Sequence, residues 1–364
     1  MKKVWLLCLY TFYLITVLSV TGYPIAMANN PRELQQKETN VNTAALKIVC
    51  EKAEKKRCLT SIFIVEDGTV LCEHYRHENI WKNPQDICSA AKTVIGLLVG
   101  IAVKKGCIQS IEDPVSHYLP DVPDNRDGRK NEIRINHLLT MTSGLEWSND
   151  DYKALEVSND PLQYVLSKPL TSLPSERFNY DVSAFLLSAI LEKACGRRTD
   201  RFAEKNLFEP LGISTAKWDS LGEYTVGYNG LHLLPEDMVK LGLFMLQNGC
   251  IGADSLLPSD WMNEMSRNQV KNGIGASIDG MGVAEEGRYG YMCWVAWKGT
   301  TRFYWAGGFG GQRIIMVPEK KLVVVMTAWV QRRVWMFRQS YWKKAAQQDR
   351  DLLNFFINEI LAAF

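Results

Sequence analysis

Residues 89–106 read SAAKTVIGLLVGIAVKKG, a long apolar stretch with a serine and a lysine near its start. The apolar part, residues 90–103, is too long and too rich in glycine for a strand. The sequence Lys-Lys-Gly at 104–106 is a helix-ending signal. We therefore predict a buried helix that begins just after Ser89 and ends at Gly106.

Strand signals lie on both sides of this helix, far apart in the chain. Residues 60–65 and 69–75 are β-rich and flank Glu66-Asp67-Gly68, which predicts a hairpin. The last third of the chain contains further strand-like runs at 289–297, 301–306, 312–317 and 321–328. Helical spacing of apolar residues predicts an amphipathic helix at 46–55 and a closing helix at about 347–364.

The middle of the chain is dominated by helical patterns separated by Pro and Gly, at 135–142, 162–166, 183–194 and 200–208. Strands at both ends with helices between them predict an α/β (α+β) fold. We expect one sheet domain with flanking helices from residues 45–106 and 223–364, and a mainly helical domain from residues 107–222. The active site should lie at their junction.

The start of the chain resembles a secretory signal. Lys2 and Lys3 precede an uncharged apolar run, and Ala26-Met27-Ala28 forms a small-x-small cleavage pattern. We predict a signal peptide at 1–28, cleaved near Ala28, a flexible arm at 29–44, and a periplasmic or secreted product. The alternative is an uncleaved anchor, because the apolar run approaches spanning length. On the first reading, the chain meets a membrane only through its signal peptide.

Composition excludes several classes of function. The chain has 46% hydrophobic and 23% charged residues, which is ordinary for a globular enzyme. Its 42 basic and 40 acidic residues give no net charge that would suggest a nucleic-acid partner. Histidines are few, and no C-x-x-C occurs, so we expect no metal site. Eight cysteines follow the signal segment, which makes disulfides plausible without deciding their pairing.

Ser-x-x-Lys motifs occur at Ser89 to Lys92 and at Ser214 to Lys217. Ser89 stands at the start of the apolar helix, where free N–H groups stabilise a developing anion, and Lys92 lies on the same face. An apolar setting should lower the lysine pKa and give an amine able to take the Ser89 proton. The alternative is an N-cap serine with Lys92 reaching toward solvent. Ser214 lacks a following apolar helix, so we interpret that motif as a surface coincidence.

Two further features extend the Ser89 hypothesis. Phe178-Asn179-Tyr180 precedes the helix at 183–194 and places a phenol where it can exchange a proton with a leaving group. The segment AGGFGGQ at 306–312 lies between two predicted strands, and a backbone N–H there, with that of Ser89, would form an oxyanion hole. Each has a structural alternative: a half-buried tyrosine and an ordinary glycine-rich hairpin.

Taken together, these features resemble the serine β-lactamase, DD-peptidase and esterase superfamily, in its class C-like branch with the aminohexanoate-oligomer hydrolases. The resemblance covers about residues 62–328 and rests on SAAKTVIGLLVGIAVKKG, DPVSHYLPD, INHLLTMTSGLEW, FNYDVSAFLLSAILEKACG, LFEPLGI, GLHLLPEDMVKLG, YGYMCWV and GGFGGQRIIMVPEKKLVVVMT. It implies a β-lactamase/transpeptidase-like fold, with a central, mostly antiparallel sheet, flanking helices and a helical insertion domain.

The same resemblance implies site roles. Ser89 is the acylated nucleophile, Lys92 its base, and Tyr180 the partner base and acid. The oxyanion hole pairs the Ser89 N–H with one near Phe309. Our candidates for the oxyanion hole and for substrate binding are Gly308, Phe309, Gln312 and Trp147.

Departures from the family pattern bear on the substrate. The family's Tyr-x-Asn is Tyr180-Asp181-Val182 here, with Ser183 as a partial substitute, and its Lys-Thr-Gly is Ala306-Gly307-Gly308. Without that lysine, hydrolysis of an uncharged ester or simple amide is expected in preference to a β-lactam. Deacylation would depend on Tyr180 or Lys92.

We expect a serine hydrolase without a cofactor that acts on a small ester, amide or peptide. The alternatives are a D-Ala carboxypeptidase, a β-lactamase, or a non-catalytic relative that binds peptide or cell-wall fragments. The sequence does not determine the oligomeric state.

Overall fold

The computed structural model describes residues 43–120, 128–270, 288–329 and 339–364. The predicted signal peptide at 1–28 lies outside these residues, as does nearly all of the predicted arm at 29–44.

A large antiparallel sheet organises the molecule. Within the described residues it has seven strands in the order β10-β11-β12-β13-β14-β1-β2. The strands are β1 (Leu59–Glu66), β2 (Thr69–Tyr75), β10 (Arg288–Tyr289), β11 (Trp294–Lys298), β12 (Thr301–Gly308), β13 (Gln312–Val317) and β14 (Leu322–Ala328). The predicted α/β (α+β) fold and the hairpin at 60–75 are therefore confirmed.

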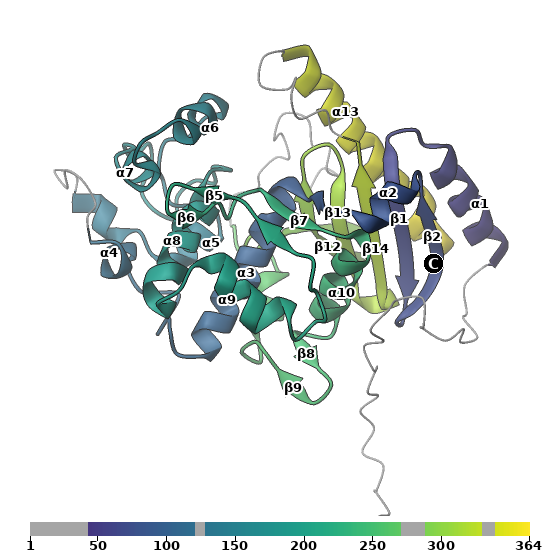
Figure 1. The fold of residues 1–364 in the computed structure, drawn as a ribbon, viewed down its shortest axis with the longest axis horizontal. Coiled ribbons are helices and arrows are strands. Elements are labelled where there is room, and N and C mark those ends of the chain that lie inside the picture. The colour runs from purple at the N-terminus through teal and green to yellow at the C-terminus, as the bar shows by residue number, and fades with distance from the viewer. Residues whose placement is uncertain (1–42, 121–127, 271–287, 330–338) are drawn as a thin grey trace, which may run out of the picture.

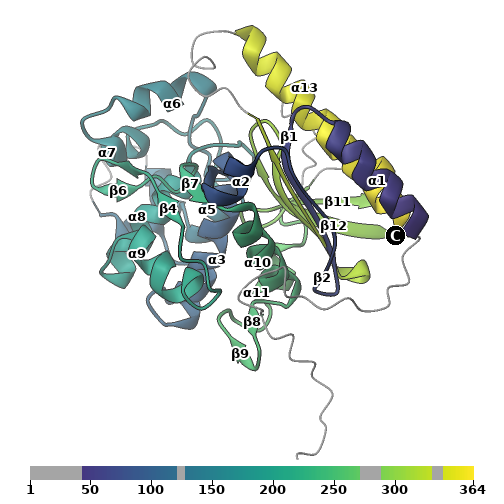
Figure 2. The ribbon, with the colours of Figure 1, turned by 45° about the vertical axis from the view of Figure 1, so that its right-hand side comes forward.

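Helices cover both faces of the sheet, as Figure 2 shows. On one face lie α1 (Thr43–Lys55) and α13 (Gln339–Phe355), and on the other lies α10 (Pro235–Leu246). This covering explains why β13 and β14 are buried along their whole length instead of alternating. Gly242 allows the close approach of α10, because a Cβ there would lie 2.6 Å from a Val323 methyl.

The helix α1 is amphipathic, as predicted: Leu46, Val49 and Ala53 are buried and face the sheet. A disulfide joins Cys50 of α1 to Cys72 of β2, across 22 residues of sequence. This covalent link fixes the first helix to the edge strand of the sheet.

The middle of the chain supplies the helices that gather beside the sheet in Figure 1. They are α4 (Val115–Tyr118), α5 (Ile135–Leu139), α6 (Asn149–Glu156), α7 (Pro161–Leu166), α8 (Ser183–Cys195) and α9 (Thr199–Ala203). The apolar stretch at 90–103 forms α3 (Ala91–Lys104), which packs against α8. The proposed boundary between a helical and a sheet domain stays a prediction.

Short elements complete the chain. They are α2 (Glu78–Lys82), α11 (Trp261–Met265), β3 (Gln85–Asp86), β4 (Lys217–Trp218), β5 (Ser220–Leu221), β6 (Tyr224–Thr225), β7 (Leu231–Leu233), β8 (Cys250–Ile251) and β9 (Asp254–Ser255). Of these, β3, β7 and β4 form a small sheet, and β3 leads directly into the segment that carries Ser89.

Two predicted elements differ from those observed. The run at 289–297 is two strands, β10 and β11, because Met292 adopts a left-handed φ of 53° between them and reverses the chain. The closing helix begins at Gln339, eight residues before the predicted start at 347, and continues beyond Phe355 as a wider turn at Phe356–Ile360.

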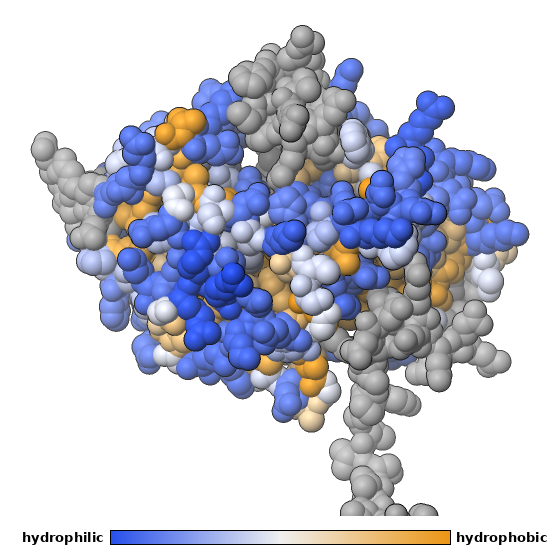
Figure 3. Space-filling model, viewed as in Figure 1, coloured by the Kyte–Doolittle hydropathy of each residue, from blue (hydrophilic) through white to orange (hydrophobic). Residues whose placement is uncertain are grey.

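The surface in Figure 3 is mainly hydrophilic, with hydrophobic residues in several separate patches. No helix in the described part of the chain is both long enough and apolar enough to cross a membrane.

Candidate active site

Ser89 lies in a 3-10 turn, Cys88–Ala90, immediately before α3. The residue before it, Cys88, adopts a left-handed φ of 51°, which is unfavourable for a side chain with a Cβ. The turn is held because the Cys88 N–H donates to Asp86 Oδ1 at 2.7 Å and the Ile87 N–H donates to the Leu231 carbonyl at 2.9 Å. The strained turn leaves Ser89 half-buried at the start of the helix.

Lys92 lies one turn later, and its side chain is buried at 2% exposure. Its Nζ is 3.1 Å from Ser89 Oγ and donates to the Tyr228 carbonyl at 3.2 Å. Burial lowers the pKa of Lys92 to about 7, although the Asp181 carboxylate and Cys88 oppose the shift. A neutral amine is therefore accessible near pH 7. With one N–H donated to Tyr228, its lone pair can accept the Ser89 proton.

Tyr180 belongs to the same cluster. Lys92 Nζ lies 4.6 Å from the centre of its ring, and that ring stacks on Trp294 at 5.6 Å. Burial raises the pKa of Tyr180, and a hydrogen bond with Ser89 opposes this shift. The phenol therefore stays protonated at neutral pH, which suits a proton donor better than a resting base.

Asp181 places a buried carboxylate behind Lys92. It is 1% exposed and accepts hydrogen bonds from the Ser183 N–H at 2.7 Å and from Ser143 Oγ at 3.2 Å. Burial raises the pKa of Asp181, while these hydrogen bonds and the nearby Lys92 charge lower it. In the sequence, Asp181 stood out only as part of a departure from the family pattern. Its effect on the Lys92 charge becomes visible only in the structure.

The end of β12 packs directly against the turn that carries Ser89. A Cβ on Gly308 would lie 2.1 Å from the Ile87 carbonyl oxygen and 3.2 Å from Cys88 Cβ. Only glycine fits at this position without moving the turn. This contact brings the predicted glycine-rich segment beside the turn that carries Ser89.

The helix α13 holds the turn that follows Gly308. Phe309 contacts Trp342 with ring centres 4.7 Å apart, and Gln348 Nε2 donates to the Gly310 carbonyl at 2.7 Å. On the neighbouring strand, Arg313 forms a buried ion pair with Asp349 at 2.7 Å. Three contacts from one helix therefore hold Phe309 and the chain that follows it.

Gln312 does not offer its side chain to a substrate in this structure. It is 3% exposed, its Nε2 donates to the Ala328 carbonyl at 2.7 Å, and its Oε1 accepts from the Ala328 N–H at 3.1 Å. The carboxamide is thus committed to the end of β14. A substrate contact from this side chain stays a prediction, and it would require these hydrogen bonds to Ala328 to break.

Trp147 contacts the cluster through Tyr152. The two rings meet edge to face at 5.3 Å, and the Tyr152 hydroxyl donates to the Asp181 carbonyl at 3.2 Å. The Tyr152 ring also lies 5.3 Å from that of Tyr228. Trp147 thus supports the residues behind Lys92, and a direct substrate contact stays a prediction.

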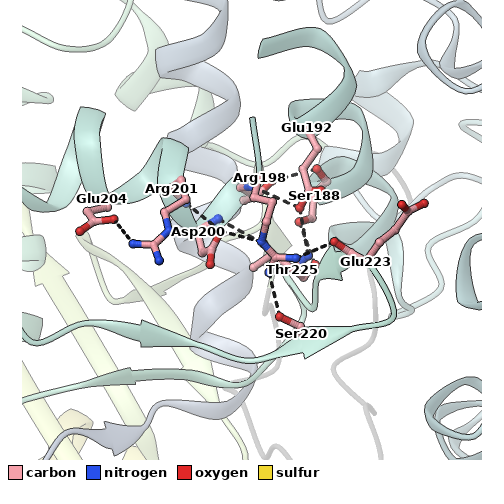
Figure 4. Close-up of polar contacts among 10 residues, drawn as sticks. Ser188, Glu192, Arg198, Asp200, Arg201, Glu204, Ser220, Glu223 and Thr225 are labelled. Carbon is pink, nitrogen blue, oxygen red and sulfur yellow. Dashed lines mark hydrogen bonds and ion pairs between the residues drawn. The ribbon is translucent and has the colours of Figure 1, made fainter. Parts of the chain in front are cut away.

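Tyr228 was not among the predicted site residues, yet its carbonyl orients Lys92. Figure 4 shows the network that holds the chain just before it. Ser188 of α8 donates to the Thr225 carbonyl at 2.9 Å, and the Thr225 N–H donates to Glu192 at 3.0 Å. Arg198 donates to Ser220 at 2.8 Å and fastens the β5–β6 hairpin. The helix that follows Tyr180 therefore also positions the acceptor for Lys92.

The Ser-x-x-Lys motif at Ser214 has a different setting. Ser214 and Lys217 are both exposed, and Lys217 begins the short strand β4. This agrees with the interpretation of that motif as a surface coincidence.

Comparison with known proteins places these residues in a family context. A family model described as Beta-lactamase matches residues 60–347. Esterase EstB of Burkholderia gladioli is 28% identical over 143 residues, which is 35% of this chain and 36% of that protein. Penicillin-binding protein 4* of Bacillus subtilis (strain 168) is 24% identical over 228 residues, or 55% of this chain and 49% of that protein. The matches therefore span about a third to a half of these relatives' lengths.

Solved structures share the fold across nearly the whole chain. A provisionally named 6-aminohexanoate-dimer hydrolase from Bacillus anthracis has a TM-score of 0.69 at 15% identity and covers 92% of this chain and 89% of its own. EstCE1, a hydrolase with promiscuous acyltransferase activity, has a TM-score of 0.64 at 16% identity and covers 85% of this chain and 99% of its own.

Proposed function

Because this chain belongs to the Beta-lactamase family, we propose that it is a serine hydrolase that cleaves a carboxylic ester or amide through an acyl-enzyme on Ser89. The observation that carries the proposal is the distance of 3.1 Å between Ser89 Oγ and the buried Lys92 Nζ. A pKa of about 7 lets this amine accept a proton at neutral pH.

In the first step, neutral Lys92 takes the Ser89 proton as Oγ bonds to the substrate carbonyl carbon. The resulting oxyanion accepts hydrogen bonds from the backbone N–H of Ser89 and from the backbone near Phe309, beside the close contact of Gly308 with Ile87. The bond to the leaving group then breaks. The leaving group receives the phenolic proton of Tyr180, which regains one from the Lys92 ammonium.

In the second step, a water attacks the acyl-enzyme carbonyl and gives up its proton to the neutral Lys92. The bond from the carbonyl carbon to Ser89 Oγ breaks, Oγ takes the phenolic proton of Tyr180, and the carboxylic acid leaves. Tyr180 then regains a proton from the Lys92 ammonium, which returns the site to its starting state. Tyr180 can donate in both steps because burial raises its pKa and keeps the phenol protonated.

The charges around the site support an uncharged substrate. Ala306 stands where the family pattern has a lysine, and it is 1% exposed within β12. The cation opposite Gly307 is Arg313, which is buried and paired with Asp349. Asp181 adds a buried negative charge near Lys92. A β-lactam or a D-Ala-D-Ala peptide presents a carboxylate that such a site attracts weakly.

The direct test is a fluorophosphonate probe with intact-protein mass spectrometry, followed by a substrate panel. Wild type should gain one adduct, Ser89→Ala none, and the matched control Ser214→Ala one, since Ser214 is exposed. Short p-nitrophenyl esters and an aminohexanoate dimer should be cleaved faster than nitrocefin or a D-Ala-terminated muropeptide. A folded wild type without an adduct would support the non-catalytic binding protein instead.

Preference for the charged substrates would reassign the activity. Faster nitrocefin hydrolysis would indicate a β-lactamase, and D-Ala release a carboxypeptidase. Relatives named Penicillin-binding protein 4* and a D-alanyl-D-alanine carboxypeptidase make both comparisons necessary.

We also infer export to the periplasm or the medium. The signal pattern at 1–28 and the Cys50–Cys72 disulfide both support this location, because disulfides persist in oxidising compartments. N-terminal sequencing should find a mature chain that begins near Asn29, and an intact Met1 would contradict cleavage.

A further inference from the structure

Two half-buried cysteines meet where α3 and α8 end. Cys107 follows α3 after Gly106, and Cys195 is the last residue of α8. The helices α3 and α8 pack against each other (Figure 1). The Cys107 side chain is a hydrogen-bond partner of the Cys195 thiol, so the two side chains are neighbours. The two residues lie far apart in sequence, and no spacing in the chain suggested this pair.

The surroundings of the pair favour access. Gly106 and Gly196, the neighbours of the two cysteines, have open space where a side chain would point. A small disulfide can therefore approach the two thiols. Burial and the neighbouring Cys107 raise the pKa of the Cys195 thiol, while the charges of Arg197 and Lys105 oppose this shift. Exchange at this pair should therefore be faster at alkaline pH, where more of the thiol is ionised.

We propose that Cys107 and Cys195 form a second disulfide, which joins the C-terminal ends of α3 and α8. Together the two thiols lose two protons and two electrons as the S–S bond forms. A disulfide reagent or disulfide-bearing protein accepts the electrons and is reduced to two thiols. The inference does not depend on the hydrolase activity.

The location gives the bond a specific structural effect. Ser89 and Lys92 lie at the start of α3, and Tyr180 lies just before α8. The bond would join the opposite, C-terminal ends of α3 and α8 and would keep these two ends from moving apart. It would also close a long loop, from residue 107 to 195, and restrict the unfolded chain.

The first experiment compares the purified protein after incubation with excess oxidised glutathione and after full reduction. Remaining thiols are alkylated, the protein is digested without reductant, and linked peptides are identified by mass spectrometry. The oxidised sample should contain one peptide pair that joins Cys107 to Cys195, besides the pair from Cys50 and Cys72. Alkylation of both Cys107 and Cys195 after oxidation, with Cys50–Cys72 intact, would overturn the proposal.

The second experiment measures the melting temperature of the oxidised protein. Cys107→Ser and Cys195→Ser should each lower it by roughly 5–10 °C, and the double variant should lower it no further. The matched control is Cys250→Ser, a half-buried cysteine of β8, which should stay within about 2 °C of wild type. Additive effects of the two single variants would also contradict a shared bond.

Discussion

The Ser-x-x-Lys motifs at Ser89 and at Ser214 have the same spacing and opposite environments. At Ser89 the lysine is 2% exposed, touches the serine oxygen and has a pKa lowered to about 7. At Ser214 both side chains face solvent, and the lysine begins an edge strand. The residues are the same, and burial makes the difference, because it removes the charge that would stop a lysine from acting as a base.

The largest effect is expected when each lysine is replaced separately by methionine, which is uncharged. Lys92→Met should lower kcat by at least about 10³-fold, because the Ser89 proton loses its acceptor. Lys217→Met should leave kcat within about twofold. Steady-state hydrolysis of a p-nitrophenyl ester measures both, and comparable losses in the two variants would end the distinction between the motifs.

The Lys92→Met variant should be more stable than wild type. The folded protein keeps Lys92 largely neutral above pH 7, whereas the unfolded chain binds its proton up to pH 10.5. The free energy of unfolding of wild type therefore rises with pH between about 7 and 10.5. At lower pH, wild type is destabilised because folding disfavours the Lys92 charge, and Lys92→Met removes this cost. We expect a gain of about 1–3 kcal/mol at pH 7 that shrinks by pH 10, as measured by urea unfolding at both pH values.

The next largest effect is expected where the sheet meets the first motif. Gly308→Ala would force a Cβ to within 2.1 Å of the Ile87 carbonyl oxygen, so the turn that carries Ser89 must move. We expect kcat to fall by about 10²-fold. The control Gly128→Ala has open space for its Cβ and should change neither kcat nor stability appreciably. Equal activity in both variants would show that the turn tolerates displacement.

Tyr180→Phe removes the phenol and keeps the ring that stacks on Trp294 and contacts Lys92. The loss of the proton donor should lower kcat by about 10–10²-fold, with the larger loss for an amide, whose leaving group needs a proton more. Equal losses for a p-nitrophenyl ester and an amide would point to a positioning role for Tyr180 instead.

The smallest expected change concerns the effect of Asp181 on the pKa of Lys92. Asp181 raises the pKa of Lys92, so Asp181→Asn should lower it further and move the ascending limb of the kcat profile to lower pH. In wild type that limb should lie near pH 7. A limb that does not move, measured from pH 5 to 9, would mean that Lys92 is not the titrating base.

Much of the fold follows from local patterns. The apolar run at 90–103 and the turn residues Glu66-Asp67-Gly68 predicted α3 and the β1–β2 hairpin, because side-chain periodicity and turn conformation are properties of neighbouring residues. The run at 289–297 misled because aromatic residues favour strands, while the left-handed Met292 that divides it has no clear sequence signal.

Part of the candidate site was predicted from the sequence, because short motifs are also local patterns. Ser89, Lys92 and Tyr180 were found from motifs. The carbonyl that orients Lys92 belongs to Tyr228, 136 residues away in the chain, and a backbone oxygen carries no sequence signal. Gln312 was taken as a substrate residue because it follows the glycine-rich segment. Only the structure reveals that both polar atoms of the Gln312 side chain are hydrogen-bonded to the Ala328 backbone.

The dependence of the turn at Phe309 on α13 has a consequence for the order of synthesis. The residues that hold it, Trp342, Gln348 and Asp349, are translated after every strand of the sheet. A nascent chain that reaches only α11 already contains Ser89 and Lys92, but it lacks β12 and the helix that holds the turn. In the proposed mechanism, the nucleophile is therefore made early and the backbone that stabilises its transition state is held in place last, so a partly synthesised chain would have no working site.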